Sequence, residues 1–296
     1  MLNKFELLMP ETLDEALDLY EQYGNRCKIL AGGTDVLVEM HTGHKEYPLL
    51  MDIKNLDELK GIRYCPETGL EFGALTTHRE LEINPIAKEL YTALQEAVSQ
   101  VGCVQTRYRG TVGGNICTAA PSGDTIGPLM VLGAVAVTKS RKYGEREIPL
   151  TEFFTGPKRT VLKEGELLIK IKLPARKKNS ASAYTKYTRR NAMDLALLGA
   201  AVDLTCANAR TCKSVRITLT TAAPTVIRAT QTEEFLTGKE LTEEVIREAG
   251  IIASAEAKPR SSWRSSEQFR REVLKAIVPR TITNALSRIS ERAVLK

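Results

Sequence analysis

Aromatic residues and paired cysteines are scarce in this chain. Only 5% of its 296 residues are aromatic, and there is a single tryptophan. The six cysteines are scattered, and no two have the Cys-x-x-Cys spacing of zinc or iron–sulfur sites, so we expect reduced thiols and no cluster. No apolar run is long enough to span a bilayer, and the N-terminus leads into acidic residues, which predicts a cytoplasmic chain.

Two common nucleotide-binding patterns are also missing. The sequence has neither Gly-x-Gly-x-x-Gly nor a Gly-Lys-Ser/Thr loop, which argues against a Rossmann domain and a P-loop enzyme. The net charge of +6 comes from 42 basic and 36 acidic residues spread along the chain, which argues against a nucleic-acid partner. His41 and His44 have no third ligand nearby, so we expect no metal there.

The remaining composition is that of an ordinary globular chain. Hydrophobic residues make up 43% of the sequence, which is enough for a full core, and the length of 296 residues favours two or three domains. Strand and helix patterns both occur, and we predict an α+β fold.

The first predicted unit covers residues 1–55. A capping box that begins at Thr12 starts an amphipathic helix, which ends near Gly24. Apolar strands at Cys27 to Ala31 and Leu49 to Ile53 flank a glycine turn and a segment that fits either a helix or a strand. We therefore predict a small βαβ-type unit.

The second predicted unit covers residues 56–176 and mixes short strands with helices. A second capping box begins at Thr77, and the apolar spacing beyond it predicts one long helix over Pro85 to Val101. Asp124 is placed to cap a helix through Leu132.

A basic, polar stretch from Arg176 to Ala181 has the composition of a linker and introduces a third unit, residues 177–296. Strands and then helices predict a C-terminal α+β domain with a three-stranded antiparallel sheet, whose last two strands form a hairpin at Asn208 to Arg210. The predicted strands are Ser182 to Tyr187, Leu195 to Leu204 and Ser214 to Thr221. The predicted helices are Thr232 to Leu236, Thr242 to Ala257 and Glu267 to Leu286.

The most distinctive stretch runs from Arg109 to Thr118 and contains Gly110, Gly113 and Gly114. Glycines among hydroxyl and amide side chains predict a tight buried turn whose backbone N–H groups converge on one point, as a phosphate requires. An ordinary turn between two strands is the alternative, and for this stretch alone it is favoured.

A second loop of similar make, Leu30 to Val36, lies between apolar runs earlier in the chain. Together the loops would clamp a diphosphate from both sides, with hydroxyl donors from Thr34 and Thr111 and an amide from Asn115. A carboxylate would repel phosphate, so we expect Asp35 to turn outward and cap or pair locally. The two loops thus predict a dinucleotide site.

These motifs resemble the paired double-glycine motifs of the FAD-binding subunits of molybdenum hydroxylases, the family of xanthine and carbon monoxide dehydrogenases. The resemblance rests on Ala31 to Asp35 and Val101 to Asn115. Ala222 to Arg228 and Pro259 to Arg264 resemble the C-terminal domain of bacterial xanthine dehydrogenase flavin subunits, so the similarity covers nearly the whole chain. It implies an FAD cofactor and a two-part FAD-binding domain of the vanillyl-alcohol-oxidase type ahead of the C-terminal domain.

The resemblance also implies which residues hold the FAD. Lys28 to Val36 and Gly110 to Asn115 would hold its diphosphate and ribityl chain, and Thr118 and Asp124 would reach its polar groups. The implied cofactor-binding residues are Lys28, Ile29, Leu30, Ala31, Gly32, Gly33, Thr34, Asp35, Val36, Val101, Thr106, Gly110, Thr111, Gly113, Gly114, Asn115, Cys117, Thr118, Asp124, Leu168 and Lys186.

Two of these residues have more specific implied roles. Leu168 would pack near the adenine end, and Lys186 would lie beside the flavin ring, where its positive charge favours the reduced flavin. From the residues alone, a solvated strand lysine is the alternative interpretation of Lys186. Two positions depart from the family pattern: Gly123 precedes Asp124 where serine is common, and Tyr108 stands where asparagine is frequent.

By resemblance the chain would be one part of an electron relay. A large subunit with a molybdenum cofactor and a small subunit with [2Fe–2S] clusters would deliver electrons to the FAD, and NAD is the expected acceptor. The chain is too short to hold the molybdenum centre as well, and no residue is assigned a catalytic or metal-ligating role. We therefore expect no hydroxylation by the isolated chain.

Two other classes of function stay open on the sequence. A stand-alone flavin oxidoreductase, such as an enolpyruvyl-sugar reductase, would need its own acid and base, and the sequence offers no convincing pair. A basic binding protein without flavin would show salt-dependent nucleic-acid binding. Purine, another heterocycle and carbon monoxide all remain possible substrates of the complex, and the C-terminal similarity favours purine.

Overall fold

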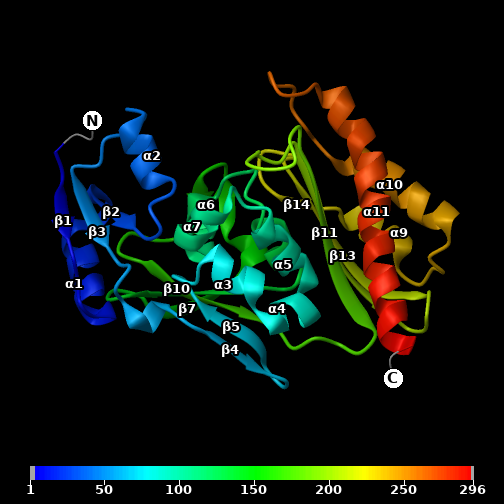
Figure 1. Ribbon diagram of the computed structural model, residues 1–296, viewed down its shortest axis with the longest axis horizontal. Coiled ribbons are helices and arrows are strands. Elements are labelled where there is room, and N and C mark those ends of the chain that lie inside the picture. The colour runs from blue at the N-terminus through cyan, green and yellow to red at the C-terminus, as the bar shows by residue number, and fades with distance from the viewer. Residues whose placement is uncertain (1–3, 295–296) are drawn as a thin grey trace.

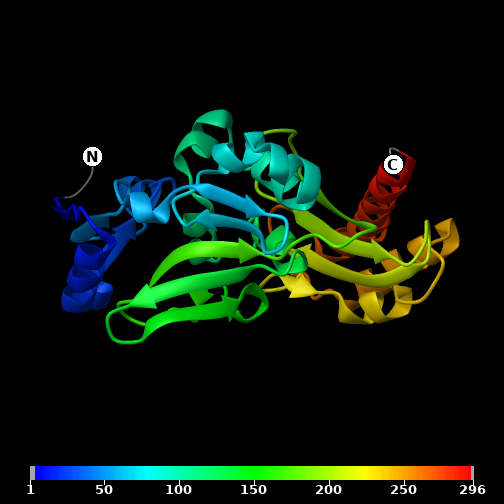
Figure 2. The same ribbon diagram turned by 90° about the horizontal axis from the view of Figure 1, so that it is seen from below.

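The computed structural model describes residues 4–294, which extend along one axis from a small N-terminal unit to a long C-terminal helix (Figure 1). Three sheets follow one another along this axis, with three, five and four strands among the described residues. Figure 2 shows the same succession from below, with the five-stranded sheet in the middle. Strands β8 (Phe154–Gly156) and β9 (Arg159–Thr160) form a separate two-stranded sheet.

The N-terminal sheet is parallel, in the order β1-β3-β2. Its strands are β1 (Glu6–Leu8), β2 (Cys27–Leu30) and β3 (Leu49–Asp52). The segment whose sequence fits either a helix or a strand is helix α2 (Val36–His41). Strand β2, helix α2 and strand β3 therefore confirm the predicted βαβ arrangement. Strand β1 has only three residues, too few for a recognisable alternation, and the sequence did not reveal it.

Helix α1 (Leu13–Tyr23) begins and ends where the sequence predicts. The hydroxyl of Thr12 accepts a hydrogen bond from the N–H of Glu15 at 3.1 Å, and Gly24 with φ +54° ends the helix. The capping box is incomplete, because the Glu15 carboxylate accepts from the N–H of Glu11 rather than that of Thr12.

The middle sheet is antiparallel, in the order β4-β5-β10-β6-β7. Its strands are β4 (Ile62–Cys65), β5 (Gly69–Gly73), β6 (Val135–Ser140), β7 (Gly144–Pro149) and β10 (Leu167–Leu173). Apolar side chains of these strands and of the neighbouring helices form the largest core cluster, which includes Phe72, Leu94 and Ile116. Val112 and Ile116 of the glycine stretch belong to this core, which therefore fixes its position.

The predicted long helix over Pro85 to Val101 is wrong, because it is broken into α4 (Pro85–Leu90) and α5 (Thr92–Ser99). At the break, Tyr91 has φ −116° and ψ 49°, outside the helical region. Its ring is fully buried, and its hydroxyl donates to the carbonyl oxygen of Pro174 at 2.9 Å. The apolar spacing of a helix continues through Tyr91 in the sequence. The contact of Tyr91 with Pro174 nevertheless breaks the helix at this residue.

A complete capping box starts α3 (His78–Ile83). The Thr77 hydroxyl accepts from the N–H of Glu80, and the Glu80 carboxylate accepts from the N–H of Thr77. We expect Thr77→Ala to lower the free energy of unfolding by about 1 kcal/mol, because the N–H of Glu80 loses its acceptor. Urea unfolding measures this, with Thr77→Ser as the control that keeps the hydroxyl. Equal loss in both variants would contradict the capping role.

The glycine stretch is not a turn between strands. It joins α6 (Val104–Arg109) to α7 (Val112–Thr118), so Gly113 and Gly114 lie in the first turn of a short helix. Asp124 does not cap the next helix, α8 (Ile126–Val131), whose N-cap is Thr125 without a side-chain hydrogen bond. Its carboxylate is engaged elsewhere, as described below.

The C-terminal sheet is antiparallel in the order β11-β12-β13-β14, so the predicted count of three strands is corrected to four. The strands are β11 (Ser180–Tyr187), β12 (Leu198–Cys206), β13 (Cys212–Thr220) and β14 (Ile227–Arg228). The added strand has two residues, which is too short to show alternation. The predicted hairpin at Asn208 to Arg210 is confirmed between β12 and β13.

Helices cover this sheet. The C-terminal helices pack on it through a second core cluster, and α5 meets it at β11 (Figure 1). They are α9 (Thr230–Leu236), α10 (Glu243–Glu256) and α11 (Glu267–Val294), the last running eight residues past the predicted end. Arg288 of α11 pairs with Glu96 of α5 and donates to the carbonyl oxygen of Ser182 at 2.6 Å. These contacts join the C-terminal sheet to the helices above the middle sheet.

Candidate functional site

The two glycine loops, far apart in the sequence, touch each other. A Cβ built on Gly32 would stand 2.0 Å from the carbonyl oxygen of Arg109 and 2.9 Å from the Cα of Gly110. No side chain fits at that distance, so glycine is required for the contact. A Cβ built on Gly110 would in turn lie 3.3 Å from the Thr34 hydroxyl of the first loop. The loops therefore form one continuous surface.

The first loop carries unused hydrogen-bond donors. Within the described part of the chain, no group accepts from the backbone N–H of Gly32, Gly33, Thr34 or Asp35. Gly33 has φ +78°, a conformation that glycine adopts without strain. Four successive N–H groups without an internal partner are a site for an anion, because they supply positive partial charge at fixed positions.

The second loop contributes mainly side chains, which corrects the expectation that its N–H groups complete the clamp. The N–H groups of Val112, Gly113 and Gly114 donate to the Thr76 carbonyl, the Ala74 carbonyl and the Thr111 hydroxyl, respectively. The Asn115 amide oxygen accepts from the Thr125 hydroxyl at 2.7 Å. Among the residues that the structure describes, none accepts from the Asn115 amide nitrogen, which is free to donate.

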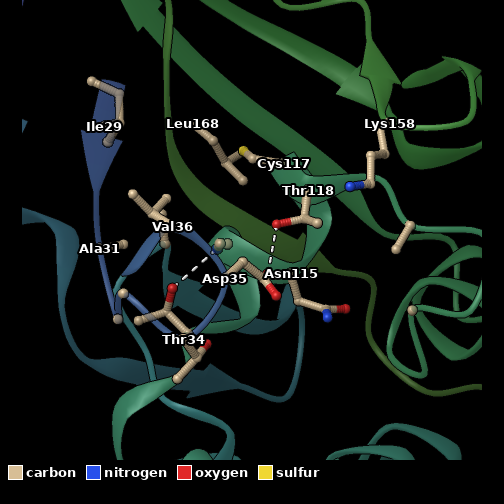
Figure 3. Close-up of a pocket in the computed structure, with 18 of the residues that line it drawn as sticks. Ile29, Ala31, Thr34, Asp35, Val36, Asn115, Cys117, Thr118, Lys158 and Leu168 are labelled. Carbon is tan, nitrogen blue, oxygen red and sulfur yellow. Dashed lines mark hydrogen bonds between the residues drawn. The ribbon is translucent and has the colours of Figure 1, made fainter. Parts of the chain in front are cut away.

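Both loops line a cavity of about 830 Å³. Its volume falls within the range of about 300–1,000 Å³ that is typical of ligand pockets. Figure 3 shows Ala31, Thr34 and Val36 on one side and Cys117, Thr118 and Leu168 on another. The predicted residues that line it are Lys28, Ile29, Ala31, Gly32, Gly33, Thr34, Asp35, Val36, Val101, Thr106, Thr111, Gly113, Gly114, Asn115, Cys117, Thr118, Asp124 and Leu168.

Three of the predicted residues are not part of the lining. Leu30 is buried in a small core with Met40 and Leu50. Gly110 lies at the contact with the first loop, and Lys186 lies behind Asp124.

Asp35 does not pair locally, which corrects the sequence-based expectation. Its carboxylate accepts a hydrogen bond from the hydroxyl of Thr118, another lining residue, at 2.9 Å (Figure 3). It makes no side-chain cap on α2. The bond ties the first loop to the end of α7, and it uses the donor that was expected to reach a dinucleotide.

The wall of the cavity contains a buried network around Asp124. Its carboxylate accepts from the Lys186 ammonium at 2.8 Å and from the Tyr184 hydroxyl at 2.9 Å. Burial raises the pKa of the Asp124 carboxyl, and the charge of Lys186 and the bond from Tyr184 oppose that rise. The Lys186 side chain is only 4% exposed, so it is not the solvated strand lysine that the sequence left open.

Lysines that the sequence analysis missed surround the cavity. Lys45, Lys158 and Lys163 join Lys28 in its lining. Two of them pair with Glu39, Lys158 at 3.2 Å and Lys45 at 3.9 Å.

Four acidic residues also line the cavity: Asp124 pairs with Lys186, Glu166 with Arg146 and Asp194 with Arg190. The fourth, Asp35, accepts from the Thr118 hydroxyl, so the lysines outnumber the acids that have no cation partner. The cavity thus favours an anion.

Other lining residues carried no sequence signal. Tyr20, at the end of an amphipathic helix, and Met193 to Leu195, in the loop between β11 and β12, reach the cavity from distant parts of the chain. Burial raises the pKa of Tyr20 to about 12. His78 also lines it and is 2% exposed. No local sequence pattern marks these positions as parts of one site, because only the fold brings them together.

The described residues offer neither a metal site nor a membrane span. Within residues 4–294, no three or more histidine, cysteine or acidic side chains come close enough to hold a metal ion. None of the helices within residues 4–294 is both long and apolar enough to cross a membrane.

Open N–H groups on a glycine loop and four lysines in the lining of the same cavity are typical of a protein that binds a phosphate-bearing nucleotide. Two family models match the chain: the FAD binding domain in molybdopterin dehydrogenase over residues 3–176, and the CO dehydrogenase flavoprotein C-terminal domain over residues 182–285. The chain therefore belongs to the family of FAD-binding subunits of molybdenum hydroxylases, and its cofactor is FAD.

Named relatives agree with this family. A xanthine dehydrogenase FAD-binding subunit of Escherichia coli O157:H7 is 32% identical over 93% of this chain and 94% of its own length. The carbon monoxide dehydrogenase medium chain of Hydrogenophaga pseudoflava is 32% identical over 96% of this chain and 98% of its own. A structure of the H. pseudoflava carbon monoxide dehydrogenase that lacks the Mo-pyranopterin moiety superposes with a TM-score of 0.92, covering 97% of this chain and 99% of the other, at 32% identity.

Proposed function

We propose that this chain is the FAD-carrying electron-transfer subunit of a xanthine-dehydrogenase-like complex. It would take electrons from [2Fe–2S] clusters on a small partner subunit, fed by a molybdenum cofactor on a large one, and pass them to NAD or another acceptor. The names of its relatives support this assignment, because they are FAD-binding subunits or medium chains of such dehydrogenases. When bound, FAD supplies a carrier that accepts electrons from one partner and delivers them to another.

One observation carries the proposal for where FAD is held. Gly32 to Asp35 offer successive N–H groups without internal partners, in a loop pressed against Gly110 and lining the cavity. This arrangement fits a diphosphate, whose negative charge backbone dipoles and nearby lysines can meet. We assign the polar chain of FAD to this loop, with the hydroxyl of Thr111 and the amide of Asn115 as further donors.

The role of Lys186 is revised in this proposal. Its ammonium is neutralised by Asp124 and does not reach the lining, so it cannot act as an isolated positive charge beside the flavin. We propose instead that Lys186 and Tyr184 position the Asp124 carboxylate on the cavity wall. The lysine would then act on the cofactor only through Asp124.

The remaining expectations are part of the same proposal. We propose FAD-binding subdomains at 1–55 and 56–176, of the vanillyl-alcohol-oxidase type, and a C-terminal domain at 177–296. The three successive sheets support this division. All six cysteines are free thiols, which supports a reducing compartment such as the cytoplasm.

Purification of the tagged chain from its native cells tests the assignment. We expect two further polypeptides to co-purify, with molybdenum and iron in the complex and FAD bound to this chain. Addition of the complex's substrate without oxygen should bleach the flavin, and added NAD should restore its absorbance. Turnover of an organic substrate by the isolated flavin-loaded chain would instead favour a stand-alone oxidoreductase. A chain without flavin would overturn the proposal.

A further inference from the structure

The loop that precedes α11 carries the most exposed large apolar side chain among the described residues. Trp263, the single tryptophan of the sequence, is 83% exposed. The guanidinium of Arg264 lies 5.2 Å from the centre of a Trp263 ring, within the range of a cation–π contact. In Figure 1 this loop lies at the upper end of α11, opposite the C-terminus. Tryptophan is highly buried on average, so an indole this open indicates a surface that a partner covers.

Three guanidinium groups gather at the same loop without an acidic partner. Burial lowers the pKa of Arg270 most, and the neighbouring charges of Arg260 and Arg264 lower it further. Within residues 4–294, no carboxylate forms an ion pair with any of these three arginines. Glu267, the first residue of α11, pairs with Arg271 instead, at 3.0 Å. Like charges held together repel one another, so the cluster favours a partner that brings negative charge.

The arginine cluster is joined to the wall of the cavity. Arg270 is 4% exposed, and its guanidinium donates to the Leu197 carbonyl oxygen at 2.6 Å and to the Ser262 hydroxyl at 3.3 Å. Met193 to Leu195, just before Leu197, line the cavity, and the two apolar side chains of this segment are also exposed. The loop that carries Trp263 therefore adjoins the cavity.

The chemistry of this surface favours one kind of occupant. Trp263, Arg260 and Arg264 are not part of the cavity lining, whereas small ligands bind in concave sites. A second copy of this chain, meeting the first through the same surface, would bring like charges together. Tryptophan and arginine are the residues enriched at the hot spots of protein–protein interfaces. The surface therefore fits a different polypeptide that presents acidic side chains and an apolar pocket.

We propose that Arg260, Trp263 and Arg264 form the docking surface for the [2Fe–2S] subunit of the complex. Electrons pass from a cluster to FAD only if the two cofactors lie near each other, and this surface adjoins the cavity assigned to FAD. Arg270 is a positioning residue, because it is buried and holds the loop to the cavity wall. The inference rests on the function proposed above and adds where the electron donor binds.

Purification of the complex through the tagged chain tests the inference, with iron and FAD measured over a dilution series. Trp263→Ala and Arg264→Glu should each raise the Kd for the [2Fe–2S] subunit about 30-fold, as hot-spot residues do. The iron-to-FAD ratio should then fall on dilution, and substrate should no longer bleach the flavin. Neither side chain is buried, so the FAD content and the melting temperature of the chain should stay at the wild-type values.

Arg210→Glu is the matched control. It makes the same change of charge as Arg264→Glu, at an exposed residue of the hairpin at the other end of β12, and it should retain the subunit. If both surface variants keep iron as Arg210→Glu does, the docking surface is wrong. It is also wrong if Arg264→Glu keeps iron and bleaching but loses reoxidation by NAD, because the arginines would then bind the acceptor.

Two further outcomes separate this surface from the fold and from the proposed function. Loss of FAD together with iron in Trp263→Ala would overturn the inference, because the loop would then maintain the cofactor site rather than bind a partner. If the wild-type chain carries FAD but co-purifies with no iron–sulfur subunit, the proposed function fails, and the docking surface fails with it.

Discussion

Replacing Gly32 by alanine is expected to strip the chain of its flavin. The added Cβ would stand 2.0 Å from the Arg109 carbonyl oxygen and 2.8 Å from its carbon, both backbone atoms that cannot rotate away. The loops must separate, which disrupts the N–H groups that face the cavity. If this costs about 3 kcal/mol, the upper end for overpacking, FAD affinity falls roughly 100-fold. The flavin-to-protein ratio after purification and the Kd of the apoprotein measure the effect.

Alanine variants of two other glycines serve as controls for Gly32→Ala. Gly156→Ala adds a Cβ whose nearest neighbour is the Arg159 side chain at 3.8 Å, so it should leave the Kd unchanged. Gly114→Ala meets only the Thr111 hydroxyl, at 2.8 Å, and should have an intermediate effect because a side chain can shift. Full flavin content in Gly32→Ala would show that the contact between the loops is not needed for the cofactor.

Replacing Lys186 by methionine is expected to be the most destabilising single change in the cavity wall. It would leave the Asp124 carboxylate buried with only the Tyr184 hydroxyl as a partner. Removing one member of a buried ion pair costs about 3–5 kcal/mol, because the remaining charge is uncompensated. The double variant Lys186→Met with Asp124→Asn should recover much of this loss. Urea unfolding of the four proteins in the cycle measures the coupling.

The same variant should depend on pH in a defined direction. With Lys186 gone, only the hydrogen bond from Tyr184 still opposes burial, so the folded-state pKa of Asp124 rises further above the ordinary value of 3.8. The folded protein then holds a proton that the unfolded chain releases, so stability falls as pH rises from 3.8 toward the raised pKa. Lys186→Met should therefore be least destabilised, relative to the wild type, in acid.

An exposed ion pair of equal length provides the control. Lys60 and Asp57 are also 2.8 Å apart, but their side chains are 44% and 90% exposed. Solvent screens such a pair, so Lys60→Met should leave stability essentially unchanged. If Lys60→Met and Lys186→Met lowered stability equally, burial would not be the cause of the effect.

Local signals in the sequence anticipated much of the architecture. Thr12 and Thr77 mark the starts of α1 and α3 because a side-chain oxygen at that point satisfies N–H groups of the first turn. The strands β2 and β3 and the hairpin after β12 also follow from short apolar runs and turn residues. Where such signals were absent or brief, as at β1 and β14, prediction failed.

The sequence by itself determined that two glycine loops, a βαβ unit and a C-terminal sheet with helices would be present, because glycine conformation, caps and alternation are properties of neighbouring residues. Only the tertiary structure decided that Gly32 touches Arg109, that Tyr91 breaks a helix to reach Pro174, and that Asp124 pairs with Lys186 rather than capping α8. These contacts depend on how distant segments pack. No periodicity along the chain records which buried charge or carbonyl a side chain will meet.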